Sequence, residues 1–471
     1  MKKAIVFVLL TWCSVGYSQE HYAGLITSSR VGILNAGINP AELNNMSNKM
    51  EVNIFGISFN VANNKIGYSD LTSDTDFEEL IFKGSEAVNA RFDMEINGIG
   101  VAMKYKKWAF AITSKATGKL DLVDIDTKMG DAITNSSLNS LLGPTTINTN
   151  YNQRINGTTW GEVGFSASKN ILDSEVHKFN VGATFKLLFP GSYANLGLDK
   201  LTGTITTTTT GAYLDNVSNT SLNIAYSGGL ADSFSNFDDY SKSIFGSLNG
   251  FSGDIGFNYQ WKEATKKEND NEDKSEDKSK DKYKNKYKLN AGLSIRNIGS
   301  MTFKDDNNYS TDYVLNIPDY INPTDGLDLS LFENIESLDE VEAILISEGY
   351  LNKTQASKKD FKVKLPTTFN AYADIKLISK FFVTGFIQQK ITDDAQNDQI
   401  TAQNIISLTP RFNTGYFEIY APLSNSEIAG FNAGIGFRIG GFYLGSGSIV
   451  SALVSDSKQA DIYTGFRWSF L

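Results

Sequence analysis

The sequence predicts an all-β protein: a single transmembrane antiparallel β-barrel of about 14 strands, with long extracellular loops. Apolar and polar residues alternate over segments of about ten residues, the length that a tilted strand needs to cross a bilayer. Beyond the N-terminus, no run of 18 apolar residues could form a membrane-spanning helix. A closed barrel would then be the way to satisfy every backbone polar group in lipid. The 471 residues include 40 Gly, 30 Phe and 21 Tyr but 8 Pro, a composition typical of many strands joined by turns.

Residues 1–18 have the pattern of a secretory signal peptide. Lys2 and Lys3 precede an apolar stretch, Ala4–Trp12, that is too short to span a bilayer. Small residues at positions 16 and 18 predict cleavage before Gln19; a buried N-terminal helix is the alternative. The one cysteine, Cys13, follows a tryptophan rather than a small residue, which disfavours lipidation. The mature chain would therefore have no disulfide.

Long alternating segments define the expected strands. In 179–189, Phe179, Val181 and Phe185 share one face, and Asn180 and Thr184 share the other. Aromatic residues near the ends of the apolar faces favour lipid outside and water inside. The alternative, a soluble sandwich, would show shorter strands and a more aliphatic core. The expected strands cover 51–62, 95–106, 108–122, 158–168, 177–189, 251–262, 287–298, 365–377, 380–390, 403–412, 415–422, 429–438, 441–449 and 460–470, so that the barrel domain extends over 51–471.

Loop lengths indicate which end of the barrel faces which side. Short turns are expected in the periplasm, near 106–107, 170–175, 379, 413–414 and 440, and long connections outside, near 63–94, 123–157, 190–250 and 299–364. The strand list does not satisfy this rule everywhere, so the count is expected to be wrong by one or two. Residues 263–286 carry mixed charge with almost nothing apolar and are predicted to be a disordered loop, periplasmic by this count.

The long outer connection 299–364 is predicted to contain a helix that caps the barrel mouth. Apolar residues recur there at helical spacing, with acidic residues between them. They are Leu327, Leu331, Ile335, Leu338, Val341 and Leu345.

Catalytic and metal chemistry have little support in the sequence. Only two histidines are present, His21 and His177, and no cysteine would survive export. A histidine-based nucleophile system in the outer loops and a thiolate metal site both lack their residues. The glycines between Gly434 and Gly440 miss the dinucleotide-binding spacing and lie within an alternating strand. We therefore predict no enzyme, no catalytic residue, no metal and no cofactor. Net charge, −10 for the whole chain and −12 without Lys2 and Lys3, argues against nucleic-acid binding.

Polar residues on the strand faces opposite the apolar ones are expected to line the lumen. The candidates are Lys186, Asp254, Lys262, Arg296, Asp374 and Arg438. Two interpretations remain open: a salt-bridged interior, and a selective pathway for a solute.

Two short motifs carry a resemblance to known families. Asn39-Pro40-Ala41, between the signal and the first strand, resembles the superfamily of fatty-acid-transporter-like outer-membrane proteins. That resemblance implies that residues 19–50 fold into the barrel as a plug, with Asn39, Pro40 and Ala41 in its turn. The stretches 441–446 and 460–468 are similar to a Bacteroidetes barrel family of unknown function. The chain ends on Phe470-Leu471, so the usual C-terminal aromatic is displaced by one residue.

These features predict a protein of the cell outer membrane, in contact with its lipid and inserted by the barrel-insertion machinery. The first functional hypothesis is passive transport of small molecules, including hydrophobic ones. The second is a plugged barrel that anchors a secretion, motility or surface complex through a periplasmic or surface protein partner. A third is a soluble β-rich adhesin. Ligand-binding residues are not identified by the sequence.

Overall fold

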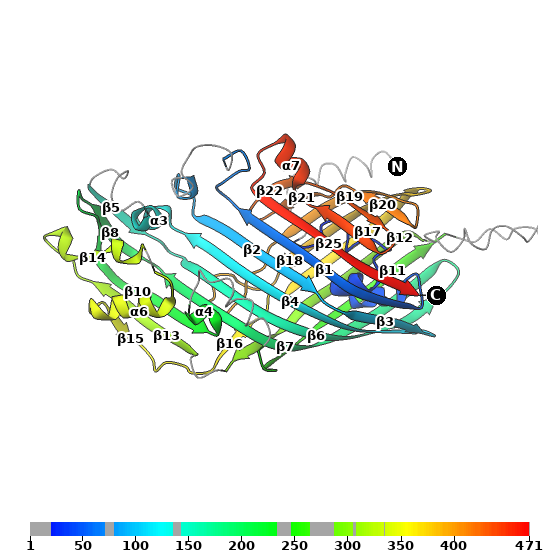
Figure 1. Cartoon of the computed structure of the whole chain (residues 1–471), viewed down its shortest axis with the longest axis horizontal. Helices are drawn as coiled ribbons and strands as arrows, with labels where there is room; N and C mark the ends of the chain where they lie inside the picture. Colours follow the sequence, from blue (N-terminus) through cyan, green and yellow to red (C-terminus); the bar gives the residue numbers. More distant parts are fainter. Residues whose placement is uncertain are drawn as a thin grey trace, which may run out of the picture.

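The computed structural model describes residues 20–70, 80–134, 143–232, 246–263, 287–304, 308–333 and 335–470. The predicted signal peptide and residues 264–286 of the charged run lie outside the described residues. Antiparallel strands form one sheet that closes on itself, because β1 (Met50–Asn63) pairs with β25 (Gln459–Phe470) from Met50–Phe470 to Ala62–Gln459. Figure 1 shows the tilted strands wrapping around a common axis. The all-β barrel is thus confirmed, and the sandwich of two stacked sheets is not found.

The barrel wall contains fourteen strands among the described residues. Four of them are interrupted, and both halves pair with the same neighbouring strand. After β1, the wall consists of β2 (Val88–Asn97) continued by β3 (Gly100–Tyr105), β4 (Trp108–Ile125), β6 (Asn152–Asp173), β7 (His177–Asp199), β11 (Gly250–Lys262), β12 (Tyr287–Phe303), β16 (Phe361–Lys364) continued by β17 (Thr368–Ile378), β18 (Phe381–Lys390), β19 (Ile405–Asn413), β20 (Phe417–Tyr420) continued by β21 (Leu423–Ser426), β22 (Gly430–Ala433) continued by β23 (Ile435–Ile439), β24 (Phe442–Ser446) and β25.

Each predicted range contains one of these wall strands, in the predicted order. The expected miscount of one or two strands is therefore wrong. Since adjacent strands are antiparallel, all five short turns lie at the end of the barrel that holds Met50 and Phe470, here called the short-turn end. The long connections lie at the opposite, long-loop end. Glu263 and Tyr287, which flank the charged run, lie at the short-turn end.

The wall has an apolar outer face and a polar inner face. On β11, Phe251, Ile255 and Phe257 are each about half exposed, whereas Asp254 and Asn258 are buried. The same alternation recurs around the ring, so large apolar side chains cover the outside and amides, hydroxyls and charged groups fill the inside. This arrangement is the inverse of a water-soluble β-protein and matches transmembrane barrels.

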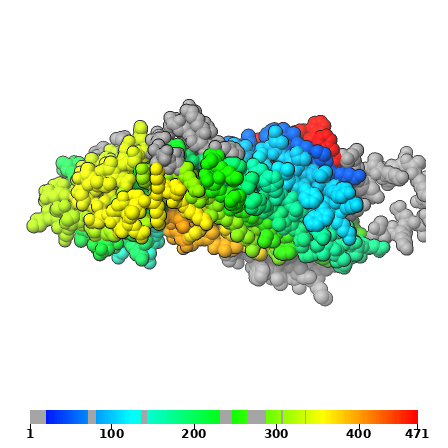
Figure 2. Space-filling model, turned by 90° about the horizontal axis from the view of Figure 1, so that it is seen from below, coloured from blue at the N-terminus to red at the C-terminus, as the bar shows by residue number. Residues whose placement is uncertain are grey.

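Strands and short helices beyond the wall form a head at the long-loop end, which Figures 1 and 2 show opposite the chain's C-terminus and the blue first strand. β7 pairs with β10 (Val217–Ser227), which continues to β13 (Tyr309–Ile317) and β15 (Leu351–Lys353). A second sheet contains β5 (Gly143–Asn148), β8 (Thr202–Thr207), β9 (Ala212–Asp215) and β14 (Leu327–Asp328). The helices are α3 (Thr127–Thr134), α4 (Gly229–Asp232), α6 (Leu338–Ser347) and, in the β24–β25 connection, α7 (Ile449–Val454), with short 3₁₀ turns η5 (Pro323–Asp325) and η6 (Leu329–Phe332).

The predicted helix in this region is shorter than expected. Only Leu338, Val341 and Leu345 lie on a helix, α6, where they face the core of the head. Leu327 belongs to β14 instead, because residues 327–328 add a strand to the edge of β9. Leu331 lies in η6 and is exposed. No helix among the described residues is long and apolar enough to cross a membrane.

Candidate functional site

Residues 20–49, here called the N-terminal segment, lie inside the barrel near the short-turn end, as the blue coils between the strands show in Figure 1. Two 3₁₀ turns, η1 (Gly32–Gly37) and η2 (Pro40–Asn45), shape the segment. Asn39 caps η2: its Oδ1 accepts from the Ala41 N–H at 3.0 Å, and Pro40 occupies the first position of the turn, where no N–H is needed. The Asn39 Nδ2 donates to the Phe257 carbonyl at 2.8 Å, so the cap also joins the segment to the wall.

Three wall glycines make room for this turn. A Cβ at Gly182 would lie 2.5 Å from the Ala41 N atom, and one at Gly256 would lie 2.0 Å from the Asn39 Oδ1. A Cβ at Gly292 would lie 2.3 Å from the Tyr372 hydroxyl, a hydrogen-bond partner of Asn39. Gly182 on β7 and Gly256 on β11 are direct cross-strand partners, and Gly292 on β12 lies opposite Asn258, two residues along β11. Larger residues there would exclude Asn39, Pro40 and Ala41 from their place.

Glu42 follows the motif and is a fully enclosed carboxylate held by neutral donors. Its Oε1 accepts from Asn258 at 2.8 Å, from Asn290 at 2.9 Å and from the Tyr372 hydroxyl. No cation among the described residues lies within ion-pair distance of it. Apolar contacts add to these bonds: Ile33, Ala36, Leu43 and Met46 of the segment pack on alanines of β3 and β4.

A second segment also enters the lumen, from the long-loop end. Residues 391–404, here called the inner loop, connect β18 to β19, and residues 399–403 are buried. Side chains of the wall hold the loop mainly by donating hydrogen bonds to the backbone carbonyls of the loop. The buried Arg154 donates to the carbonyls of Asp394 at 2.5 Å and Gln399 at 3.1 Å, and the Tyr193 hydroxyl donates to that of Asn397 at 2.7 Å.

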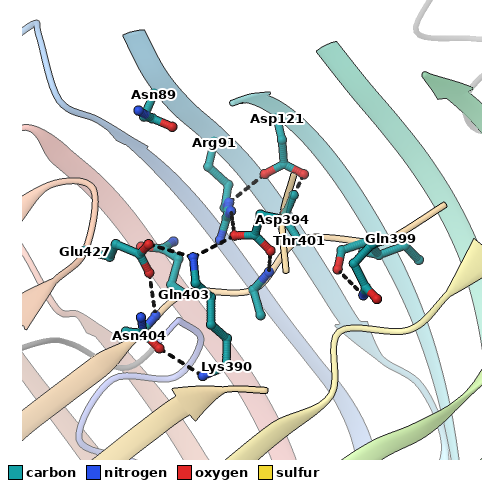
Figure 3. Close-up of polar contacts among 12 residues, drawn as sticks. Asn89, Arg91, Asp121, Lys390, Asp394, Gln399, Thr401, Gln403, Asn404 and Glu427 are labelled. Atoms are coloured by element: carbon teal, nitrogen blue, oxygen red, sulfur yellow. Dashed lines mark hydrogen bonds and ion pairs between the residues drawn. The ribbon is translucent and has the colours of Figure 1, made fainter. Parts of the chain in front are cut away.

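Buried ion pairs connect the inner loop and the N-terminal segment through the same wall residues, and Figure 3 shows the inner-loop side of this group, with Arg91, Asp121 and Asp394. Arg91 lies 2.5 Å from Asp121 and 3.8 Å from Asp394 of the loop. Arg91 also lies 3.8 Å from Glu20, the first described residue of the segment, whose carboxylate is 2.8 Å from the Lys119 Nζ. The two internal segments thus share cationic partners on β2 and β4.

A chamber of about 130 Å³ lies between the two segments. Ile33, Leu34 and Ile38 of the N-terminal segment give it an apolar side, and Ala402 of the inner loop borders it as well. The wall contributes a polar side with alternating charges: Glu95, Lys115, Lys119, Glu162, Lys186, Asp254 and Arg296. Lys115 lies 3.3 Å from Glu95 and 3.2 Å from Glu162.

The structure places the six predicted lumen residues in three groups. Lys186, Asp254 and Arg296 line the chamber, with Lys186 and Asp254 2.9 Å apart. Asp374 is buried elsewhere in the lumen, where it accepts from the hydroxyls of Tyr287 and Thr384. Arg438 lies 3.3 Å from the buried Glu418. Lys262 lies at the rim instead, where it pairs with Asp173 and donates to the Ser174 carbonyl of the β6–β7 turn.

Sequence reasoning missed the inner loop and Glu42. Glu42 directly follows the Asn39-Pro40-Ala41 motif, so its position was the available signal. The inner loop has a polar composition like any surface loop, and its anchor, Arg154, lies more than two hundred residues away in the chain. Among the described residues no group of three His, Cys, Asp or Glu side chains is placed to hold a metal. His21 contacts Ser58 in the lumen, and His177 contacts Tyr259 at the rim.

Comparison with known proteins identifies the family. The profile of the family of unknown function DUF5723 matches residues 40–447, so the chain belongs to this family. The expected resemblance to a family of unknown function is thereby confirmed. No curated protein matches the chain significantly.

Solved structures similar to the chain include a hydrocarbon channel and a toluene transporter, both of very different sequence. The deltaS2S3 mutant of the TodX monoaromatic hydrocarbon channel has 10% identity and a TM-score of 0.46, with 93% of this chain and 95% of that chain covered. The Pseudomonas putida toluene transporter TodX has 9% identity and a TM-score of 0.39 (96% and 94% covered). A Pseudomonas aeruginosa FadL homologue has 9% identity and a TM-score of 0.24 (96% and 98% covered). Likenesses this distant do not identify the function of the present chain.

Proposed function

We propose that this member of the family of unknown function is an outer-membrane channel through which small molecules pass passively, with the N-terminal segment as its plug. The observation that carries this proposal is the chamber of about 130 Å³, enclosed between two internal segments in a barrel that is polar inside and apolar outside. A barrel filled only for stability would have no need of such a space, since protein interiors are close-packed.

The outer surface supports the membrane location. Trp108, Trp261 and Trp468 are 40%, 44% and 56% exposed, and all three lie near the short-turn end of their strands. Lys169 and Lys288 lie over the Trp108 and Trp261 rings, 5.0 Å and 5.2 Å from the ring centres. Aromatic rings with lysines beside them are typical of the membrane–water interface. The short-turn end would then face the periplasm, and contact with lipid would follow insertion by the barrel-insertion machinery.

The chamber favours small molecules with a polar part. Charged and amide side chains of the wall line one part of the chamber, and apolar residues, several of them from the N-terminal segment, contribute the larger share of its lining surface. A purely hydrophobic solute would leave these polar groups without water or a partner, which is unfavourable. A small molecule with both an apolar and a polar part therefore matches this mixed lining better than a purely hydrophobic one. Catalysis is not part of the proposal, because the two histidines lie apart and contact only hydroxyl groups among the described residues.

Fractionation and liposome swelling test the channel. The protein should remain with the outer membrane and migrate differently on gels before and after heating. In liposomes, a variant lacking residues 20–49 should let small solutes through faster than the wild type, and a variant lacking residues 264–286 should behave like the wild type. Equal and negligible swelling of all three folded proteins, with every solute class, would contradict a channel.

A second candidate function is a plugged anchor for a surface or periplasmic complex, such as a secretion or motility assembly. The observation that favours it is the head, which has a hydrophobic core of its own separate from the barrel. Cross-linking and pull-down from native membranes would test it, comparing the wild type with variants shortened in the head or lacking residues 264–286. Loss of a specific partner with insertion intact would support the anchor; identical partners for all variants would not.

A further inference from the structure

Among the lysines and arginines that line the chamber, Arg296 is the one that forms no ion pair with a carboxylate of the described residues, and Glu95 acts on its charge only from beyond ion-pair distance. The other three lining cations, Lys115, Lys119 and Lys186, each lie within 3.3 Å of a carboxylate. No carboxylate of the described residues lies within 4.0 Å of the Arg296 guanidinium. Its Nε is buried and has no hydrogen-bond partner in the described structure, and no described acceptor takes its other N–H groups. A guanidinium carries five N–H donors. In this partly buried side chain the enclosed Nε–H is left unpaired, which is unfavourable, and the other donors are open to a ligand in the chamber.

The local backbone explains why Asp254 does not neutralise Arg296. The register between β11 and β12 shifts by one residue between Gly253 and Ile255. Through this bulge the Asn297 N–H donates to one oxygen of the Asp254 carboxylate, with an N–O distance of 2.7 Å. The Lys186 Nζ lies 2.9 Å from the other carboxylate oxygen. Asn297 has a positive φ of 58°, a conformation that asparagine tolerates better than most residues. Asp254 is therefore already engaged, and the neighbouring Arg296 is left facing the chamber.

We propose that the chamber binds a small organic carboxylate, with Arg296 as its anchor. This inference rests on the proposed function, because it names the solute class of the same chamber. A carboxylate matches the guanidinium by two parallel hydrogen bonds, which a single-point cation such as lysine cannot offer. Thr184, Thr368 and Gln388, which also line the chamber, add neutral polar groups.

The space sets the size of the ligand. A volume of about 130 Å³ is close to that of a cavity that holds one benzene molecule, so the ligand is of about that size. Ile33, Ile38 and Phe386 provide an apolar surface for the part of the molecule that carries no charge. A long acyl chain does not fit this space while both internal segments are in place.

Benzoate and benzamide test the assignment, because they have the same shape and differ in charge. Binding to the purified full-length protein in detergent is measured by equilibrium dialysis at constant ionic strength. We expect benzoate to bind the wild type and benzamide to bind at least tenfold more weakly, which is about 1.4 kcal/mol. R296Q should weaken benzoate binding by tenfold or more. R296K keeps the charge without the paired donors, so its affinity for benzoate should lie between those of the wild type and R296Q.

The control is K288Q, a change of the same kind on the same strand at an exposed position over the Trp261 ring. It should bind benzoate like the wild type, and the heat-dependent gel shift shows that each variant is folded. Equal binding of benzoate and benzamide, or equal binding by wild type and R296Q, would overturn the proposal. Displacement of benzoate by inorganic phosphate at equal concentration would overturn the carboxylate as the preferred class. Binding needs no flux, so a protein that binds benzoate but conducts nothing would contradict the channel and leave the site standing.

Discussion

The two segments that enter the lumen are held in opposite ways. The N-terminal segment contributes its own side chains: Asn39 and Glu42 bond to the wall, and apolar residues pack on the alanines of β3 and β4. The inner loop is held chiefly by wall side chains, above all Arg154 and Tyr193, that donate to its backbone carbonyls. Fit against the wall therefore decides the position of the first segment, whereas a few long wall side chains decide the position of the second.

The largest effect should come from filling the space that the N-terminal segment occupies. In Gly182→Val, the new side chain meets the backbone of Pro40 and Ala41, which cannot move aside without shifting the whole turn. Overpacking of this kind costs about 1–3 kcal/mol or more, so we expect a lower thermal midpoint in detergent and proteolysis within residues 20–49. Gly385→Val is the matched control, because its Cβ has open space around it. Equal effects of the two changes would show that the space beside Gly182 is not what positions the N-terminal segment.

Removing the anchor of the inner loop should release that loop and leave the N-terminal segment in place. Arg154→Met deprives the carbonyls of Asp394 and Gln399 of their donor, at a cost of about 1–3 kcal/mol for each buried group left unpaired. Limited proteolysis should then cut within 391–404. Arg154→Lys, which keeps one donor group, should be intermediate. Cleavage in both segments at once would mean that the shared ion pairs join them into a single unit.

Glu42→Gln should have a smaller effect, confined to the N-terminal segment. The amide oxygen can still accept from Asn258, Asn290 and the Tyr372 hydroxyl, but these bonds to a charged acceptor become weaker neutral ones. The new amide nitrogen can no longer accept from the Asn45 side chain, as the Glu42 Oε2 does at 2.6 Å. We expect a loss of about 1 kcal/mol, measured as a shift in the thermal midpoint. Tyr372→Phe combined with Glu42→Gln should cost little more than either change alone, and additive losses would speak against this bond.

The smallest effect should come from Asp398→Asn in the inner loop. Asp398 lies 3.0 Å from Lys364, and both side chains are about half exposed. Surface pairs of this kind contribute about 0–1 kcal/mol. The thermal midpoint and the proteolytic pattern should therefore match those of the wild type, in contrast to Arg154→Met.

The alternation of apolar and polar residues along the sequence was sufficient to predict the strands of the barrel wall. Side chains on a strand point alternately to the two faces, so segments such as 251–262 state directly which residues meet lipid and which meet the lumen. Strand number, order and direction followed from counting such segments. Asn39-Pro40-Ala41 was singled out by its resemblance to a known family, and the structure adds that Asn39 caps a 3₁₀ turn that begins with Pro40.

Tertiary structure alone decided what happens inside the ring. Gly182, Gly256 and Gly292 leave one continuous space for the Asn39-Pro40-Ala41 turn only when their three strands are placed in register. Arg154 binds the inner loop although more than two hundred residues separate them in the chain. Its acceptors there are backbone carbonyls, which every residue type has, so the residue types of the loop do not indicate this contact. Arg296 forms no ion pair with Asp254, because a one-residue bulge places the backbone N–H of the neighbouring Asn297 against the Asp254 carboxylate. Periodicity fixes the face on which a residue lies, but contacts across a closed lumen depend on register, bulges and the path of the loops, which no local pattern records.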